Sequence, residues 1–493
     1  MTRQTRLAAL VNTVVLIAAA IYFFVLPVAI LLGDLNDPGL RRGTVPAFAY
    51  RWHHSLSQRY QPWAAERVAS GQAAQLDTYN ISGTEWPIYS SVFYLWASEA
   101  LQQDWEKNPS ASPTAPKDYA HDAIAAAAAL VADPNHAAWV KVHWGENYLH
   151  RENLFYRMLL ISGLTSYQKL SDQKTYELLL RDQVESLSAE LDASPYGLLD
   201  DYPGECYPID ILPAIAAIRR ADAVLDTDHS AFAERALRAF QDTRLDPATG
   251  LPAYIADPTT GRGIGSARGV GISFMLTWAP ELWPNTAHQW YKIYDEQFWR
   301  PGWTLAGFSE LPKNYPHADW FVLDVDAGPV IFGYGTAASA FGLAASRVNG
   351  HFEQAYPLGA QALAVSWPLP DGTLLGPRLL SNLSDAPFVG EAALLFSFTR
   401  KTITTETAPT NVLMPLSVYV VLLGYLIAAL FICWRAIRRL RHIQATPPAF
   451  SNLQFNIWLV LTVAGAITAA FSMIGMALLV AAQFFPLRVQ NDI

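Results

Sequence analysis

The chain has 493 residues, a formal net charge of −9 at pH 7 and 52% hydrophobic residues. This acidic balance, without a visible basic stripe, argues against nucleic acid as a partner. Its two cysteines, Cys206 and Cys433, cannot pair, because the first lies in a polar loop and the second in an apolar run. The protein therefore does not rely on a disulfide framework.

Three apolar runs are long enough to cross a bilayer, which takes about 20 residues. They cover residues 7–32, 412–434 and 457–485. A signal peptide is the alternative for the first run, but the run is long for that role and no clear cleavage site follows it. We expect an N-terminal anchor at residues 1–34 and two C-terminal spans, within residues 411–434 and 455–487.

Basic residues beside these runs predict their orientation. Arg3 and Arg6 precede the first run, and a larger group follows the second: Arg435, Arg438, Arg439, Arg441 and His442. Positive charge marks the cytoplasmic side. The N-terminus and the basic loop at residues 435–454 are therefore expected in the cytoplasm. The large middle section is expected outside the inner membrane, in the periplasm or the extracellular space.

The middle section is predicted to be all-α. Residues 35–62 indicate a linker, and residues 63–405 carry apolar residues at helical spacing, separated by loops rich in Gly, Pro and Asp. Segments with this spacing include residues 120–132, 154–171, 172–191, 209–225, 230–241, 271–283, 287–299, 336–348 and 351–364. About ten to twelve helices joined by short and long loops favour an (α/α)6 toroid. A superhelical repeat array is the alternative, but it needs a fixed period, and none is visible.

The loop at residues 197–210 is the most distinctive stretch of the middle section. It holds four carboxylates and two Tyr-Pro pairs around a single cysteine: Asp200, Asp201, Glu205, Asp210, Tyr202, Tyr207 and Cys206. Clustered acids perturb each other's pKa values, which suits acid/base chemistry. Helix capping is the alternative interpretation, since acidic residues are favoured in first turns.

Three further stretches combine acids with aromatic residues at the start of a predicted helix. The first carries Glu85 and Trp86, the second (residues 143–153) carries Trp144, Tyr148 and Glu152, and the third (residues 319–329) carries Trp320, Asp324 and Asp326. In a toroid, the loops at one rim line a single cleft. We therefore expect all four stretches to converge there.

Metal and cofactor sites are not predicted. His143, Glu146 and His150 would share a face of a helix, but Gly145 indicates a loop and the spacing is not that of a zinc motif. The carboxylates around Cys206 disfavour a reactive thiolate.

Paired carboxylates suit acid/base work at an ether or alcohol oxygen, because one is kept protonated while the other activates water or holds a developing cation. Glycoside cleavage is the type case. The nearby aromatic side chains suit stacking on sugar rings, and they equally suit an isoprenoid chain or a carbocation.

Three motifs resemble the linalool dehydratase/isomerase family: residues 152–157 (E-N-L-F-Y-R), residues 197–206 (G-L-L-D-D-Y-P-G-E-C) and residues 324–328 (D-V-D-A-G). The resemblance implies an (α/α)6 barrel on the outer side of the inner membrane, and it is compatible with a homo-oligomer. Enzymes of that family use two cysteines in this loop and a histidine on the preceding helix. Here the loop ends carry Asp201 and Asp210, and the histidine position lies near Leu159, so linalool chemistry cannot be carried over.

We therefore predict a membrane-anchored glycosidase-like enzyme that acts on a glycan or glycolipid. The choice of hydrolysis rests on analogy with other (α/α)6 barrels, many of which are hydrolases. An isoprenoid dehydratase/isomerase and a non-catalytic barrel are the alternatives. The predicted catalytic residues are Asp201, Asp210, Glu152 and Asp326. The predicted substrate-binding residues are Glu85, Trp86, Trp144, Tyr148, Tyr202, Glu205, Tyr207, Trp320 and Asp324.

Overall fold

The computed structural model describes residues 3–77, 80–243, 245–313, 315, 321–324, 326–382, 384–403 and 412–445. The chain divides into two compact units. One contains the described parts of residues 1–33, 367–371 and 419–493, and the other contains those of residues 34–366 and 372–418.

The smaller unit is built from apolar helices: α1 (Arg3–Ala20), the π-helix η1 (Ile21–Val25), and most of α2 (Leu26–Leu35) and of α20 (Leu416–Ala445). Trp367 joins them, because its indole N–H donates to the Phe23 carbonyl at 2.5 Å and its ring lies 5.2 Å from that of Tyr425. Two stretches, Ala9–Arg42 and Leu416–His442, are long and apolar enough to cross a membrane. The third predicted span, residues 457–485, lies outside the described residues.

The larger unit is mostly helical. Its α-helices are α3 (Gly39–Arg42), α4 (Ala47–Ser70), α5 (Ile81–Lys107), α6 (Pro116–Tyr119), α7 (His121–Ala132), α8 (Ala138–Trp144), α9 (Leu154–Leu170), α10 (Glu177–Ala193), α11 (Pro208–Leu225), α12 (Ser230–Thr243), α13 (Gly269–Leu276), α14 (Ala279–Leu282), α15 (Pro284–Phe298), α16 (Thr336–Val348), α17 (Phe352–Ser366), α18 (Leu375–Ser381) and α19 (Val389–Thr399). The first long helix begins earlier than the sequence predicted, because Phe48, Trp52 and Leu56 of α4 are buried.

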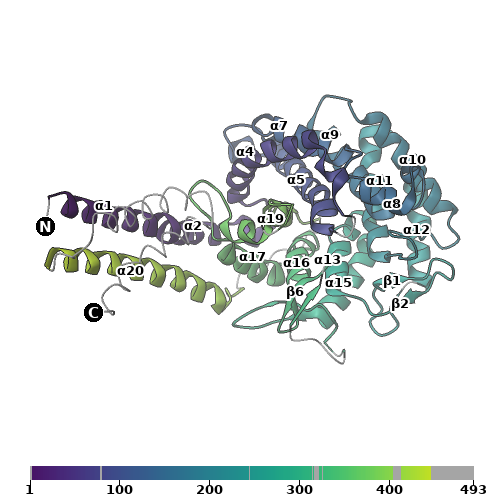
Figure 1. The fold of residues 1–493 in the computed structure, drawn as a ribbon. Helices are drawn as coiled ribbons and strands as arrows, with labels where there is room; N and C mark the ends of the chain where they lie inside the picture. The colour runs from purple at the N-terminus through teal and green to yellow at the C-terminus, as the bar shows by residue number, and fades with distance from the viewer. Residues whose placement is uncertain are drawn as a thin grey trace. The chain divides into compact units, whose positions relative to one another are not determined.

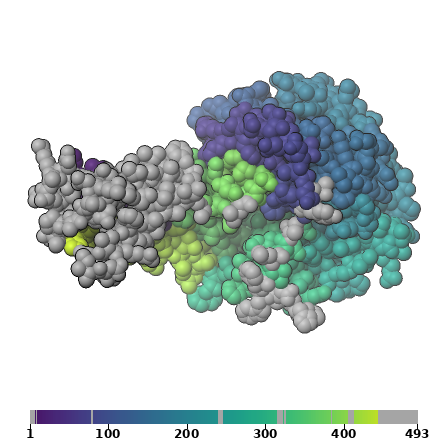
Figure 2. All heavy atoms as spheres, in the orientation of Figure 1, coloured from purple at the N-terminus to yellow at the C-terminus, as the bar shows by residue number. Residues whose placement is uncertain are grey.

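Six of these helices contact one another in a closed series, in which α5 contacts α9, then α11, α13, α16, α19 and α5 again (Figure 1). These are named the ring helices. Along the chain, α4 precedes the first ring helix, and α7, α10, α12, α15 and α17 come between successive ring helices. Each of these six helices lies against a ring helix. Figure 2 shows the early residues of this unit beside α19, in agreement with the contacts of α19 with α4 and α5.

The two groups of helices differ in their burial pattern. The ring helix α9 is buried on every side from Tyr156 to Tyr167, as expected of a helix surrounded by protein. By contrast, α10 buries Leu180, Val184, Leu187 and Leu191, which form one stripe at helical spacing, and exposes Leu178 on another face. The ring helices therefore supply the core, and the others cover it.

Short antiparallel strands fill some of the long loops. β1 (Ile255–Ala256) pairs with β2 (Gly263–Ile264), and β3 (Trp299–Arg300) pairs with β4 (Gly307–Phe308). A three-stranded sheet has the order β5 (Phe321–Asp324), β6 (Gly328–Ile331) and β7 (Tyr334–Gly335). Its register places Asp324 opposite Gly328, so the β5–β6 turn carries Asp326 and leads toward α16.

Candidate active site

Several ring helices begin close to one another. The Leu154 N–H at the start of α9 donates to the carbonyl of Asp200, in the loop before α11, at 3.2 Å. Asn80, which caps α5, donates to Asp385, which precedes α19, at 3.2 Å. The loops before α13 and α16 meet where the Tyr254 hydroxyl donates to Asp326 Oδ2 at 2.6 Å. The loops that precede these helices therefore lie at one end of the ring.

The acid-rich loop folds back on itself before α11. The Asp201 N–H donates to the Glu205 carbonyl at 2.8 Å, and the Gly204 N–H donates to Asp200 Oδ2 at 2.7 Å. Gly204 has a φ of +82°, which a residue with a side chain rarely adopts. This tight turn leaves Glu205 exposed to solvent and Asp201 only 1% exposed.

Asp201 is an incompletely paired buried carboxyl group. Its Oδ2 accepts a hydrogen bond from the Tyr207 N–H at 2.9 Å, whereas its buried Oδ1 has no partner at full hydrogen-bond geometry, and the Phe155 N–H makes only a weaker contact that lowers the pKa of this carboxyl group. Burial raises the pKa of Asp201 well above its usual value, and the negative charge of Asp210 raises it further. Both effects favour the protonated form of Asp201.

Asp210 lies in the first turn of α11. A helix N-terminus favours a negative charge. Here burial outweighs that effect and, together with the charge of Asp326, raises the pKa of Asp210 to about 7. This carboxyl group is therefore close to half-ionised at neutral pH.

Glu85 on α5 completes the group. It accepts a hydrogen bond from the Tyr202 hydroxyl, which lowers its pKa, but burial dominates and the charge of Asp326 adds to it, so the pKa of Glu85 is raised to about 7. Glu85, Asp201, Asp210 and Asp326 are named the acid cluster. Among the described residues, none of the four forms an ion pair with Lys, Arg or His. The guanidinium of Arg268 lies over the Tyr254 ring but pairs with Glu310 and Asp324, at 2.7 and 3.0 Å.

Aromatic rings lie directly beside the acid cluster. Burial raises the pKa of Tyr89 far above its usual value, and the negative charges of Asp210 and Asp326 raise it further. The Tyr89 ring lies 4.3 Å from that of Phe93, 5.8 Å from Phe155 and 6.0 Å from Phe274. Tyr207 and Tyr254 also belong here, since their rings are 5.3 Å apart and the charge of Asp326 acts on both. Tyr89 and Tyr254 were not among the residues predicted from the sequence, although Tyr89 lies one helical turn after Glu85.

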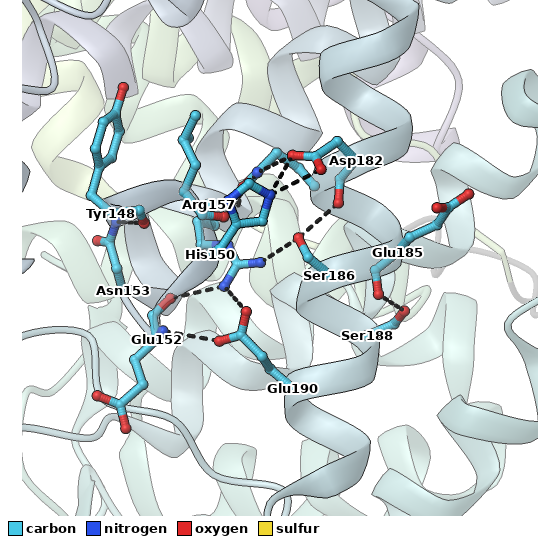
Figure 3. Close-up of polar contacts among 12 residues, drawn as sticks. Tyr148, His150, Glu152, Asn153, Arg157, Asp182, Glu185, Ser186, Ser188 and Glu190 are labelled. Atoms are coloured by element: carbon cyan, nitrogen blue, oxygen red, sulfur yellow. Dashed lines mark hydrogen bonds and ion pairs between the residues drawn. The ribbon is translucent and has the colours of Figure 1, made fainter. Parts of the chain in front are cut away.

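Glu152 lies in different surroundings from the acid cluster. Its N–H donates to Glu190 Oε2 at 3.0 Å, its carbonyl accepts from Arg157 at 3.3 Å, and Figure 3 shows its carboxyl group pointing away from both partners. Burial raises its pKa, followed by the charge of Asp200. Its φ of +35° is unusual for a residue with a side chain. The structure therefore brings Glu85 to the predicted catalytic aspartates and leaves Glu152 in the Arg157 network.

The remaining predicted residues divide between packing and surface positions. Trp144 is buried with Arg151 over its ring, and Tyr148 packs on Tyr156 with ring centres 5.8 Å apart. Trp86 is partly buried on α5. Glu205 accepts a hydrogen bond from the Tyr207 hydroxyl at 2.9 Å.

Asp324 and Trp320 belong to the last predicted stretch. Asp324 Oδ1 accepts from the N–H groups of Asp326 and Ala327, both at 2.9 Å, so it shapes the turn that presents Asp326. Trp320 lies outside the described residues.

Within the described parts of the chain, no three His, Cys, Asp or Glu side chains gather in a way that could hold a metal ion. The His150 ring, one of the residues considered for a metal, instead pairs with Asp182 at 2.9 Å (Figure 3).

A second cluster of charges, in which only Glu99 is fully buried, lies further along the ring helices. Glu99 on α5 contacts Lys169 at 2.8 Å and Arg220 at 2.7 Å, and it accepts from the Ser166 hydroxyl at 2.7 Å. Glu281 contacts Arg400 at 2.5 Å and Arg220 at 3.4 Å. The five charged residues Glu99, Lys169, Arg220, Glu281 and Arg400 are named the paired cluster. Despite its burial, the pKa of Glu99 is lowered to about 2 by Arg220 and Lys169.

No protein-family model matches the chain, and no curated protein matches it.

Proposed function

We propose that the larger unit is an (α/α)6 barrel. The closed series of contacts among the six ring helices supports this assignment, as does the alternation of ring and covering helices along the chain. We also propose that α1–α2 and α20 anchor the protein in the inner membrane. The basic residues after the second span then place the barrel on the outer side.

We propose that the barrel is an enzyme that works by carboxyl acid/base catalysis. The observation that carries this proposal is the acid cluster, in which four carboxyl groups meet without a neutralising cation among the described residues. Leaving such groups unpaired costs folding free energy, and sites of this kind are where catalytic acids and bases occur.

Hydrolysis of a glycosidic bond is the reaction we favour. Protonated Asp201 donates its proton to the leaving oxygen as the C–O bond breaks. Ionised Asp210 accepts a proton from the water whose oxygen bonds to the sugar carbon, so the two carboxyl groups exchange protonation states. Asp326, held by the Tyr254 hydroxyl, places a negative charge where a positive charge develops on the sugar.

Dehydration or isomerisation of an isoprenoid alcohol is the second candidate. The aromatic rings of Tyr89, Phe93, Phe155 and Phe274 beside the carboxyl groups favour it, because ring faces stabilise a carbocation. Asp201 would protonate the hydroxyl, which leaves as water, and Asp210 would then accept a proton from carbon.

A non-catalytic barrel would have its acids paired with arginines such as Arg151 or Arg157. Arg157 instead pairs with Glu190 at 2.8 Å, and Arg151 lies over Trp144. These contacts give no support to that alternative.

The test uses the full-length protein in nanodiscs, with 4-nitrophenyl glycosides and geraniol as probe substrates. Asp201→Asn should abolish turnover of whichever probe reacts, while Asp172→Asn, at an exposed position, should not. Infrared spectroscopy gives a readout that needs no substrate. The carbonyl band of a protonated carboxyl group should be present at neutral pH and should weaken in Asp201→Asn. A spectrum unchanged by this substitution would contradict the proposed acid.

A further inference from the structure

Four apolar side chains of the larger unit are exposed together on two neighbouring loops. Trp303 and Leu305 lie between β3 and β4 and are 78% and 38% exposed, whereas Ile331 and Phe332 lie at the β6–β7 turn and are 40% and 61% exposed. The Tyr334 hydroxyl donates to the Leu305 carbonyl at 3.2 Å and holds the two loops together. These four residues are named the apolar patch.

The apolar patch is joined to the first turn of α20. The Leu416 N–H donates to the Trp303 carbonyl at 2.8 Å, and the Ser417 N–H donates to the Thr304 carbonyl at 3.0 Å. Leu416 is also the first residue of the stretch that is apolar enough to span a membrane. A spanning helix starts at the boundary between headgroups and hydrocarbon, so the membrane anchor proposed for α20 would put Trp303 at the depth where Trp is enriched in membrane proteins.

Phe332 has a left-handed backbone conformation, which a bulky side chain disfavours. It is the first of two residues in the β6–β7 turn, with a φ of +52°, and Gly333 follows with a φ of +78°. Asn or Gly normally occupies the first position of such a turn, because a bulky side chain at positive φ costs about 1 kcal/mol. An exposed phenylalanine in this place points to a use of the ring outside the core.

A cavity of about 190 Å³ lies next to this turn. One group of lining residues is apolar, namely Leu311, Val322, Val330 and Gly333, and Gly333 directly follows Phe332 in the chain. The other group is polar and consists of Arg268, Glu310 and Asp324. Arg268 covers the Tyr254 ring at 4.6 Å, and the Tyr254 hydroxyl donates to Asp326, so the polar lining is two side chains away from the acid cluster.

We propose that the apolar patch contacts the lipid bilayer, and that the substrate is a membrane-resident amphiphile whose apolar chain enters this cavity from the patch. A glycolipid and an isoprenoid alcohol share this chemistry. The substrate class rests on the proposed function of the acid cluster, whereas lipid contact at the patch does not depend on it.

Spin labels test the lipid contact in liposomes of phosphatidylcholine and phosphatidylglycerol. Labels are placed at Trp303→Cys, Phe332→Cys and, as the control, Asp172→Cys, in a Cys433→Ala background, since Cys206 is buried. Oxygen dissolves in the bilayer, whereas a nickel chelate stays in water. At positions 303 and 332, oxygen should therefore relax the spin label more strongly than the nickel chelate does, and at position 172 the chelate should have the stronger effect. Leu305→Cys replaces either variant that fails to fold. Nickel access at all patch positions equal to that at position 172 would overturn the proposal.

Photocrosslinking tests the path into the cavity. The full-length protein is illuminated in liposomes that contain a phosphatidylcholine with a diazirine near the end of one acyl chain, and the adducts are located by mass spectrometry. We expect adducts at the patch and at Val322 or Leu311. Val330→Trp, which fills the cavity, should remove the cavity adducts and keep those of the patch. Adducts confined to α20 would overturn the path, even if Asp201→Asn abolishes turnover.

Discussion

Two glutamates on one helix show how surroundings decide what a buried carboxyl group does. Glu85 and Glu99 both lie on α5, about 21 Å apart along its axis at 1.5 Å per residue. Burial acts on both, yet the pKa of Glu85 is raised to about 7 and that of Glu99 is lowered to about 2. The difference comes from Arg220 and Lys169, which contact Glu99 and have no counterpart beside Glu85 among the described residues.

The comparison separates a stabilising cluster from one suited to chemistry. In the paired cluster, Lys169 lies in the last turn of α9, where a cation is favoured by the helix dipole as well as by Glu99. In the acid cluster, burial acts on Glu85, Asp201 and Asp210 but not on the exposed Asp326, and among the described residues no cation relieves the cost of burial and like-charge repulsion. Glu85 and Asp210, whose pKa values are raised to about 7, exchange protons near neutral pH, which is what an acid/base site requires.

The largest expected effect is on turnover. Removing the proton-exchanging group in Asp201→Asn or Asp210→Asn should lower kcat by about 100- to 10,000-fold, the usual contribution of general acid/base catalysis. Glu152→Gln should lower it far less, because the charges that act on the Glu152 carboxyl group are those of Asp200, Arg151 and Glu190 and not those of the acid cluster. Steady-state rates on the reacting probe substrate measure this, with Asp172→Asn as the control. Equal losses in Glu152→Gln and Asp210→Asn would contradict the assignment of roles.

The next largest effect is a loss of stability when the paired cluster is altered. Glu99→Gln leaves the partly buried Lys169 and Arg220 with less compensating charge, which should cost about 3 kcal/mol of unfolding free energy. Because the pKa of Glu99 is lowered, its stabilising contribution exists above its ordinary pKa of 4.5 and is lost as pH falls toward 2. Denaturant unfolding of the full-length protein should therefore show the loss at neutral pH. A loss of the same size at about pH 3 would argue against an electrostatic cause.

Neutralising a carboxyl group of the acid cluster should change the stability in the opposite direction. The pKa of Asp210 is raised from 3.8 to about 7, so its ionisation destabilises the fold increasingly as pH rises through that window. Asp210→Asn removes this penalty and should stabilise the protein by about 1–2 kcal/mol at about pH 8, and hardly at all at about pH 4. Thermal unfolding of wild type, Asp210→Asn and Asp172→Asn at both pH values measures the difference. A variant less stable than wild type at about pH 8 would show that Asp210 is satisfied by contacts.

Helical spacing predicted much of the fold, but not all of the site. Residues 336–348 form α16 as predicted, and residues 154–171 form α9 to within one residue, because a buried helix needs apolar residues around most of its circumference. Asp201 and Asp210 were singled out because they share one loop. The roles of Tyr89 and Tyr254 were missed, since both depend on contacts between segments far apart in the chain.

The separation of Glu152 from the acid cluster could not be predicted either. The motif around it places Glu152 five residues before Arg157, and only the fold shows that Arg157 turns to Glu190 on α10. Spacing along the chain therefore identified the polar segments, while tertiary packing decided which side chains face one another.

The smallest expected effect is the pKa change that follows the loss of one hydrogen bond at Glu85 or at Glu99. Tyr202→Phe removes the hydroxyl that lowers the pKa of Glu85, and Ser166→Ala removes the one that lowers the pKa of Glu99. Each bond is worth about 1 kcal/mol, so each pKa should rise by about 0.7 units. Only the first change falls near neutral pH, because Glu99 remains ionised through Arg220 and Lys169.

Carbon-13 NMR titration of labelled glutamate carboxyl groups, in full-length protein in micelles, distinguishes the two sites. Glu85 should titrate at higher pH in Tyr202→Phe than in wild type, and Glu99 should stay ionised at neutral pH in Ser166→Ala. If Glu85 titrated near its ordinary pKa of 4.5 in wild type, the contrast between the two clusters would fail, since burial without a cation would no longer be what separates them.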